Sequence, residues 1–270
     1  MSTPFAHKKS LGQHFLNSDF IPERLCAAAN LVPGEVVVEI GPGTGALTRC
    51  LLKHGVVVIA VETDPRAIAV LEETFAEEIM AQKLVISAQD ARTLDLTTLG
   101  ITDHGYKVVA NIPYYLSGYL FRSFLESDRQ PTDLVFLVQK EVAERITRDP
   151  KSSLLSLSVA AFGTPTYICT VKRGHFTPPP QVDSAIIAIH SINRDHFSTF
   201  SPQYFFMLLH LGFGQKRKQL LGNLAAHFER PYLEAVFLRL GLALTVRAED
   251  LTLHVWLRLV AELPGEGPPT

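Results

Sequence analysis

The segment from Val36 to Gly55 constrains the fold of this chain more than any other stretch. It begins with a nearly continuous apolar run, Val-Val-Val-Glu-Ile, of the kind that a parallel sheet buries on both faces. The turn Gly41-Pro42-Gly43-Thr44-Gly45 follows, and leucines at helical spacing then run to Gly55. A strand, a glycine-rich turn and a helix form the first half of a nucleotide-binding βαβ unit, so the sequence predicts an α/β fold.

Apolar runs and helical patterns continue to alternate after this unit. We expect further strands at residues 56–61, 84–87, 107–111, 133–138 and 167–171, and a last one that ends at His190. Residues 191–202 resemble a linker, and beyond them apolar residues repeat at helical spacing. The expected architecture is a Rossmann-like, seven-stranded α/β domain over residues 1–192, followed by a small all-helical C-terminal domain over residues 193–270.

Charge and cysteine content limit the classes of protein and partner. The 270-residue chain has 25 Lys and Arg against 27 Asp and Glu, a formal net charge of −2 at pH 7, so an anionic partner must be met by a local basic patch. The three cysteines are distant from one another and form no Cys-x-x-Cys pair, which argues against a disulfide framework and a zinc site. We therefore expect a cytoplasmic protein without a metal.

No stretch of the sequence is predicted to enter a membrane. Residues 1–10 contain two lysines and no apolar run, unlike a signal peptide. The uncharged stretch 152–171 is long enough to span a bilayer, but four serines, three threonines, Gly163 and Pro165 interrupt it. We expect it to form a buried helix, a turn and a strand.

Four positions fall at the carboxyl ends of the expected strands, which is where ligands bind in doubly wound sheets. They are Gly41, Glu62, Asp90 and Asn111. Glu62 follows Gly41 by 21 residues, the spacing at which such folds place an acidic residue on ribose hydroxyls. The Asp90 carboxylate could accept a hydrogen bond from an adenine amino group, although a helix cap or a solvated loop residue is an equally good interpretation.

The strand expected at residues 107–111 ends in Asn111-Ile112-Pro113-Tyr114. Pro113 fixes its own φ at about −65° and biases Ile112 toward an extended conformation, which directs the Ile112 carbonyl outward. The Asn111 amide can donate and accept hydrogen bonds, and Tyr114 adds a flat ring. Such a set suits a planar ligand that carries an exocyclic amino group. A strand that ends at a proline turn explains the tetrapeptide equally well.

The loop Phe176-Thr177-Pro178-Pro179-Pro180 is expected to be stiff, because three successive prolines remove most of its conformational freedom. Phe176 is therefore held in one place. Its ring serves either as a plug in the core or as one wall of a binding slot.

A basic cluster, Gln215-Lys216-Arg217-Lys218, is predicted to lie on a helix. Most such clusters are solvated helix faces. Together with Lys8, Lys9, Lys172 and Arg173, however, it could form a track for a phosphate backbone, whose contacts would make binding salt-dependent.

Other enzyme classes fit the sequence less well. Gly41-x-Gly43-x-x-Ala46 also matches a dinucleotide fingerprint, which makes an NAD-dependent oxidoreductase a serious alternative. That chemistry needs a catalytic acid near the nicotinamide, and the end of the fourth strand offers acceptors and an aromatic ring instead. The chain has no Gly-x-Ser-x-Gly, His-Glu-x-x-His or Gly-x-x-x-x-Gly-Lys motif, so hydrolase, zincin and P-loop chemistry lack their residues.

A set of ordered motifs runs along nearly the whole chain: Leu11 to Leu16, Glu39 to Gly45, Glu62, Asp90, Asn111 to Tyr114, Gln139 to Val142, Phe176 to Ala185 and Gln215 to Lys218. In these motifs the chain resembles the KsgA-type small-subunit ribosomal RNA adenine N6,N6-dimethyltransferases. It departs from that family at residue 14, which is His here and Asn in some members, and at Leu154-Leu155, where a Tyr-Gly pair is frequent.

The resemblance implies a methyltransferase domain, S-adenosyl-L-methionine as cofactor and no metal. The implied activity is transfer of methyl groups to N6 of two adjacent adenines near the 3′ end of 16S rRNA, late in the biogenesis of the small ribosomal subunit, by a monomer. Resistance enzymes that methylate large-subunit rRNA share the catalytic motifs and are the nearest alternative, and a non-catalytic assembly factor is another. The basic cluster and the Phe176 loop favour the small-subunit branch.

The resemblance also implies residue roles, which we state as expectations. The Asn111 amide oxygen and the Ile112 carbonyl, directed by Pro113, would accept hydrogen bonds from N6 of an extruded adenine. Tyr114 would stack on that base, and Phe176 would form the opposite wall. The cofactor would be bound by His14, Leu16, Gly41, Gly43, Glu62, Asp90 and Asn111, and the RNA by Lys8, Lys9, Lys216, Arg217 and Lys218.

Overall fold

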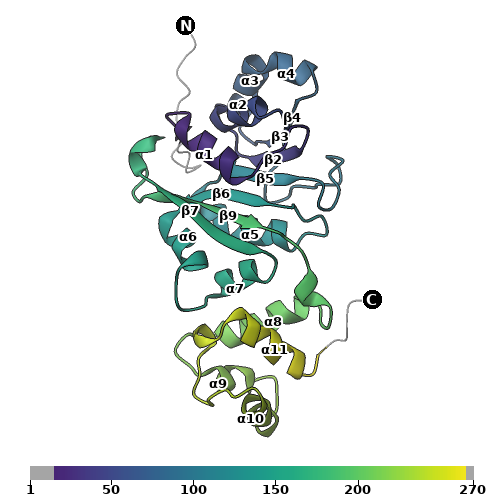
Figure 1. Cartoon of the computed structure of the whole chain (residues 1–270), viewed down its shortest axis with the longest axis vertical. Helices are drawn as coiled ribbons and strands as arrows, with labels where there is room; N and C mark the ends of the chain where they lie inside the picture. Colours follow the sequence, from purple (N-terminus) through teal and green to yellow (C-terminus); the bar gives the residue numbers. More distant parts are fainter. Residues whose placement is uncertain (1–14, 266–270) are drawn as a thin grey trace. The chain divides into compact units, whose positions relative to one another are not determined.

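The structure is a computed structural model that describes residues 15–265. It contains two compact units, coloured along the chain in Figure 1. The first unit runs through residue 144, resumes over residues 165–192 and holds the sheet. The second unit combines residues 145–164 with the chain from residue 193 onward and is helical. Residues 145–164 thus group with the C-terminal helices, although they precede the last strands in the chain.

Seven strands form one sheet in the order β4-β3-β2-β5-β6-β9-β7, which confirms the expected seven-stranded α/β architecture. Strands β4, β3, β2, β5 and β6 run parallel to one another, whereas β9 runs antiparallel to β6. Figure 1 shows β2, β5, β6 and β9 side by side. The strands are β2 (Val36–Ile40), β3 (Val57–Val61), β4 (Leu84–Ser87), β5 (Lys107–Asn111), β6 (Leu134–Gln139), β7 (Thr164–Val171) and β9 (Ser184–His190).

Helices connect β2 to β3, β3 to β4 and β5 to β6, as doubly wound sheets require, whereas the described residues 88–106 join β4 to β5 through turns. Asp64 caps α3, with Pro65 in its first turn, because its Oδ1 accepts a hydrogen bond from the Arg66 amide at 3.1 Å. Ser117 is the first residue of α5, and its hydroxyl donates back to the Tyr114 carbonyl at 2.9 Å. These helices are α1 (Phe20–Ala28), α2 (Ala46–Lys53), α3 (Pro65–Thr74), α4 (Ala76–Met80), α5 (Ser117–Leu125) and α6 (Lys140–Thr147).

The core of the first unit lies where α1 and α2 pack on the sheet. Helix α1 contacts α2, β5 and β6, and its buried side chains are Ile21, Pro22, Leu25 and Cys26. The continuous apolar runs predicted buried strands correctly: in β6 all residues except the last are fully buried. The stretch that raised the question of a membrane span forms α7 (Leu154–Ala160) and β7, and no helix among residues 15–265 is long and apolar enough to cross a bilayer.

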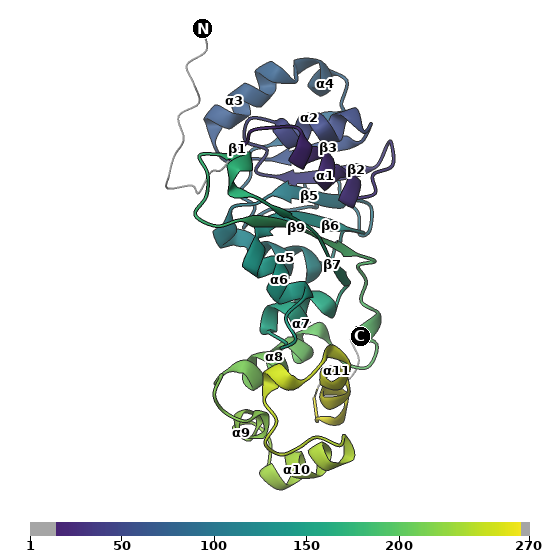
Figure 2. The ribbon, with the colours of Figure 1, turned by 60° about the vertical axis from the view of Figure 1, so that its left-hand side comes forward.

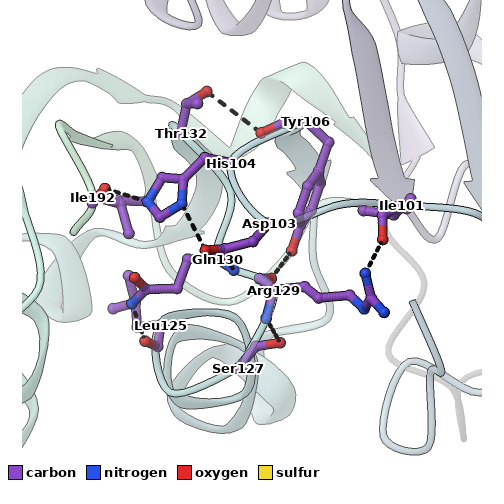
Figure 3. A network of polar contacts seen from close by, with 10 residues as sticks. All are labelled: Ile101, Asp103, His104, Tyr106, Leu125, Ser127, Arg129, Gln130, Thr132 and Ile192. Atoms are coloured by element: carbon purple, nitrogen blue, oxygen red, sulfur yellow. Dashed lines mark hydrogen bonds and ion pairs between the residues drawn. The ribbon is translucent and has the colours of Figure 1, made fainter. Parts of the chain in front are cut away.

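A polar network fastens the amino ends of β5 and β6 (Figure 3). The Tyr106 carbonyl accepts from the Thr132 amide at 2.9 Å, and the Tyr106 hydroxyl donates to the Arg129 carbonyl at 2.7 Å. His104 lies between the Asp103 carboxylate, at 3.1 Å, and the Ile192 carbonyl, at 2.9 Å. These contacts fix where β5 begins, and therefore where its carboxyl end and Asn111 emerge.

A two-stranded sheet that the sequence did not predict joins β1 (Phe15–Leu16) to β8 (Phe176–Thr177). The strands are antiparallel, with Leu16 opposite Phe176. This pairing brings the first described residues to the proline-rich loop, about 160 positions further along the chain. It also decides the direction of the Phe176 ring.

The second unit contains four C-terminal helices, gathered as a bundle in Figure 2. Its centre is the fully buried Trp256, which stacks on Phe213 with ring centroids 5.9 Å apart and donates to the Ala248 carbonyl. The expected helical domain is therefore present. The helices are α8 (Pro202–Phe213), α9 (Leu220–Leu224), α10 (Arg230–Arg239) and α11 (Leu253–Glu262).

Lys216, Arg217 and Lys218 do not lie on a helix, so that sequence prediction is wrong. They form an exposed turn between α8 and α9, which we call the basic turn. Helix α8 stops at Phe213, where the Gly214 amide donates to the Leu211 carbonyl at 3.1 Å, and the Lys218 amide then donates to the Gln215 carbonyl at 3.0 Å. All three residues are exposed to solvent.

Candidate functional site

A pocket of about 200 Å³ opens at the carboxyl ends of the parallel strands. It lies entirely in the first unit. The pocket is therefore where doubly wound sheets bind their ligands. Its lining comprises Phe15 and Leu16 together with residues 39–44, 46–47, 61–63, 89–92 and 111–116.

The glycine turn forms one wall and needs glycine for two separate reasons. Gly41 and Gly43 have φ values of +67° and +57°, in the left-handed region that other residues enter only at a cost. A Cβ on Gly43 would also lie 2.7 Å from Cε1 of Phe15. The ring of Phe15 therefore closes directly over the turn. Sequence reasoning missed Phe15 as a pocket residue, although it belongs to a recognised motif.

Glu62 stands at the end of β3 with 8 % of its surface exposed. Its Oε1 accepts from the amides of Thr63 and Asp64 at 2.8 and 2.9 Å, and its Oε2 from the Gly43 amide at 3.3 Å. Backbone donors thus hold the carboxylate against the glycine turn. The two predicted cofactor positions are in direct contact.

Glu39 is a second carboxylate of the pocket wall, and sequence reasoning gave it no role. It is 1 % exposed and accepts a hydrogen bond from the Thr48 hydroxyl at 2.6 Å. Burial, with a smaller contribution from the charge of Glu62, raises the pKa of Glu39 to about 8. The sequence did contain a clue to Glu39, because it is the single acidic residue within an otherwise apolar buried strand.

Asp90 follows β4 and lines the pocket beside Arg92. The Arg92 guanidinium donates hydrogen bonds to the Asp90 carboxylate. Its Nε lies 3.1 Å from both carboxylate oxygens, and its Nη2 lies 2.6 Å from Oδ2. This hydrogen bonding holds the pKa of Asp90 below its ordinary value. Asp90 also accepts from the Arg92 amide at 2.9 Å, so it closes its own turn while facing the pocket. Sequence reasoning missed Arg92.

The tetrapeptide after β5 completes the pocket. Asn111 is the last residue of the strand, and Pro113 has φ −59° and ψ 131°, as its ring requires. The Ile112 side chain points into the core and is buried. Tyr114 begins a short 3₁₀ turn, and its hydroxyl lies 2.7 Å from Oγ of Ser184 on β9. Burial raises the pKa of Tyr114 above its ordinary value, so the ring carries a neutral hydroxyl.

Several predicted site residues lie elsewhere. Phe176 is 2 % exposed, belongs to the hydrophobic core and does not line the pocket, because its pairing with Leu16 turns the ring inward. Of the two interpretations, the structure matches the core plug. The basic turn belongs to the second unit. Lys8, Lys9 and His14 lie outside the described residues.

Comparisons with known proteins match nearly the whole chain. The family model described as "Ribosomal RNA adenine dimethylase" matches residues 5–264. The chain is also 40 % identical over 261 residues to the "Ribosomal RNA small subunit methyltransferase A" of Dehalococcoides mccartyi (strain CBDB1), a match that covers 96 % of this chain and 89 % of that protein.

Two solved structures share the fold over nearly the whole chain. One is a dimethyladenosine transferase from Plasmodium falciparum, with a TM-score of 0.78 and 27 % identity over 91 % of this chain and 96 % of that one. The other is the 23S rRNA methyltransferase ErmE, with a TM-score of 0.72 and 24 % identity over 92 % of this chain and 99 % of that one. The second likeness is one of fold alone.

Proposed function

The chain belongs to the ribosomal RNA adenine dimethylase family, and from that premise we propose that it methylates N6 of two adjacent adenines near the 3′ end of 16S rRNA. The relative with 40 % identity carries a small-subunit name, which supports this substrate over a large-subunit one. The observation that carries the proposal is the pocket, where a glycine turn and acidic residues meet Asn111-Ile112-Pro113-Tyr114 at one sheet edge. The function implies a monomer that works in the cytoplasm, on the small ribosomal subunit.

S-adenosyl-L-methionine would lie across the strand ends. Its ribose would bind Glu62, and its methionine moiety would lie along Gly41 and Gly43, where the absence of side chains permits close approach. Its adenine amino group would donate to Asp90. The Asp90 carboxylate is held by Arg92, so it stays ionised and keeps a fixed orientation as an acceptor. Leu16 would cover the cofactor from β1, and His14 remains a predicted contact.

The methyl acceptor would enter beside Asn111. N6 of adenine is a poor nucleophile because its lone pair is delocalised into the ring. Hydrogen bonds from N6 to the Asn111 amide oxygen and the Ile112 carbonyl would favour a tetrahedral nitrogen and stabilise the positive charge that develops as the methyl group arrives. No strong base is needed, since the methylated amine is acidic enough to lose its proton afterwards.

The aromatic contact to the base would come from Tyr114. Its hydroxyl contact with Ser184 anchors the ring to β9, and stacking on a flipped base contributes roughly 1–3 kcal/mol. Phe176 would have to leave the core to reach the same base, so we assign it to packing rather than to substrate. A pocket that accepts the monomethyl product as well would allow the second transfer.

The proposal is tested by incubating the full chain with radiolabelled S-adenosyl-L-methionine and small subunits that lack the methylation. Label should appear on two neighbouring adenines near the 3′ end of 16S rRNA as dimethyladenosine. Large subunits and the Asn111→Ala variant are the matched controls, and both should remain unlabelled. Label on large-subunit RNA would favour the resistance-type alternative. Tight subunit binding without any label would favour a non-catalytic assembly factor.

A further inference from the structure

Two cysteines and a histidine with metal-ligand chemistry converge where α1 meets α2, away from the pocket lining, and a glutamate contacts the histidine. We call Glu23, Cys26, Cys50 and His54 the α1–α2 cluster. Glu23 and Cys26 are three residues apart on α1, while Cys50 lies on α2 and His54 follows it by one turn as the C-cap. Residues three or four apart share one helix face, so each helix presents two donors to the other.

The donor atoms are close enough to share one ion. The Sγ atoms of Cys26 and Cys50 are 3.1 Å apart, and the ligand atoms of both cysteines and His54 lie within 4.8 Å of one another. Nε2 of His54 lies 3.3 Å from Oε2 of Glu23. A tetrahedral zinc site with bonds of about 2.0–2.3 Å has ligand–ligand edges of roughly 3.3–3.8 Å. The imidazole–carboxylate distance matches such an edge, whereas the two sulfur atoms would have to move apart to share the ion.

The two thiols of the cluster are buried, whereas the imidazole and the carboxylate are partly exposed to solvent. Cys26 and Cys50 are 1 % and 3 % exposed, while the side chains of His54 and Glu23 are 37 % and 50 % exposed. A buried cysteine pair alone would be explained by core packing, because free cysteine behaves as a small hydrophobe. Packing does not explain why an imidazole and a carboxylate close the solvent side of the pair. In that arrangement an ion would find its ligands together and could reach them from the solvent side, past His54 and Glu23.

The cluster is already linked by hydrogen bonds that an ion would replace. The Cys26 thiol donates to the Cys50 sulfur, and His54 hydrogen-bonds the Glu23 carboxylate. The ligand atoms of the two cysteines and the histidine therefore lie together, with Glu23 in contact with His54. Cys169, the third cysteine, packs on the same core but is not part of the group.

We propose that Glu23, Cys26, Cys50 and His54 bind one zinc-class divalent cation. Two thiolates with an imidazole and a carboxylate form the mixed soft and borderline set that favours Zn²⁺ in tetrahedral geometry. Binding converts both thiols into thiolates and releases their two protons to solvent, with no oxidation or reduction. The sequence expectation of no metal rested on spacing along the chain, which cannot detect donors from two different helices.

The cation would join two helices of the core. The N-cap of α2 is Gly45, in the glycine turn of the pocket, and its C-cap is His54. An ion bound at its carboxyl end would therefore fasten α2 to α1 and restrain the helix from which the turn extends. The expected consequence is a melting temperature that rises with metal concentration.

The test is a titration of the reduced, chelator-treated full chain with Co²⁺. One equivalent should produce thiolate-to-cobalt charge-transfer absorption in the near ultraviolet together with the visible bands of a four-coordinate ion. Zn²⁺ should displace it, since zinc binds such sites more tightly than cobalt. His54→Ala, an exposed position whose loss spares the core, should weaken binding at least tenfold, whereas exposed His227→Ala should not.

The cysteine variants make the test specific. Cys50→Ser should remove most of the charge-transfer absorption, and Cys169→Ser should leave it intact. Failure of the wild-type chain to develop the absorption would overturn the proposal, as would an undiminished absorption in Cys50→Ser. A mass two hydrogens lower, with both thiols resistant to alkylation, would also overturn it by identifying a Cys26–Cys50 disulfide instead.

Discussion

At the scale of single residues, Glu39 and Glu62 stand on neighbouring strands of the pocket but are held in different ways. Three backbone amides donate hydrogen bonds to the Glu62 carboxylate. Glu39 has the Thr48 hydroxyl and is otherwise enclosed by the core. The pKa of Glu39 therefore changes on folding, and the free energy of unfolding should depend on pH where Glu39 titrates.

The sign of this effect follows from the pKa of Glu39, which folding raises from 4.5 to about 8. Between these values the folded state retains a proton that the unfolded state has lost. The contribution to stability is complete below pH 4.5 and is lost as pH rises through 8, with a slope of at most about 1.4 kcal/mol per pH unit. Glu39→Gln can still accept from Thr48 but cannot titrate. Urea unfolding from about pH 5 to pH 9 should show the wild type losing stability relative to this variant. A difference that does not change with pH would contradict the assignment.

A second prediction at this scale concerns Asn111. Asn111→Ala removes the amide oxygen that would stabilise charge on N6, so turnover should fall by roughly 10²–10³-fold, as it does when one oxyanion-hole donor is lost. Cofactor affinity should stay largely intact, because Glu62, Asp90 and the glycine turn remain. Single-turnover methylation and calorimetry with S-adenosyl-L-methionine separate the two effects. Near-normal turnover in the variant would rule out the proposed role.

At the scale of elements, the turn between β2 and α2 is the part of the fold with the least freedom to change. Gly43 combines a φ of +57° with the Phe15 ring 2.7 Å from the site of its missing Cβ. Strand β1 can therefore close over the turn only while residue 43 is glycine. The turn and β1 act as one structural unit, although they come from separate parts of the sequence.

Gly43→Ala should accordingly cost roughly 1–2 kcal/mol from the left-handed backbone, with a further cost from displacing Phe15. It should also weaken cofactor binding, since the methionine moiety of the cofactor is proposed to lie along this turn. The matched control is Gly118→Ala on α5, where φ is not positive and no atom lies within 4 Å of the new Cβ. Chemical denaturation and calorimetry should show a loss for the first variant and none for the second. Equal behaviour of the two variants would show that the turn tolerates a side chain.

At the scale of the whole molecule, a net charge of −2 cannot attract RNA by itself. Local cation groups must do so, and the basic turn exposes three of them in the helical unit. Reversing Lys216, Arg217 and Lys218 to glutamate should weaken binding to small subunits and reduce its salt dependence, by up to about 0.7–0.9 in slope for each lost phosphate contact. Cofactor affinity should not change.

The control for that experiment is Lys83→Glu, an exposed lysine of the first unit that does not line the pocket. Filter binding over a range of salt concentrations distinguishes the two variants. If the triple reversal binds subunits as the wild type does, the basic turn is only a solvated surface.

The seven strands, the helical C-terminal unit and the residues at the strand ends could all be predicted from the sequence alone. The signals for them, which are apolar periodicity, capping and glycine turns, act over a few neighbouring positions. Expected site residues such as Glu62, Asp90 and Asn111 line the pocket because the carboxyl ends of parallel strands meet at one edge. Each of these inferences needed only local chemistry and a known rule of topology.

Contacts between residues that are distant in the sequence could be identified only in the tertiary structure. The pairing of β1 with β8 placed Phe15 over Gly43 and turned Phe176 into the core, and neither follows from the pattern of one segment. The same holds for Cys26 and Cys50, which lie 24 residues apart in sequence and in contact in space. Contacts of this kind depend on how whole elements pack, and packing is specified by the sum of many side chains rather than by any motif.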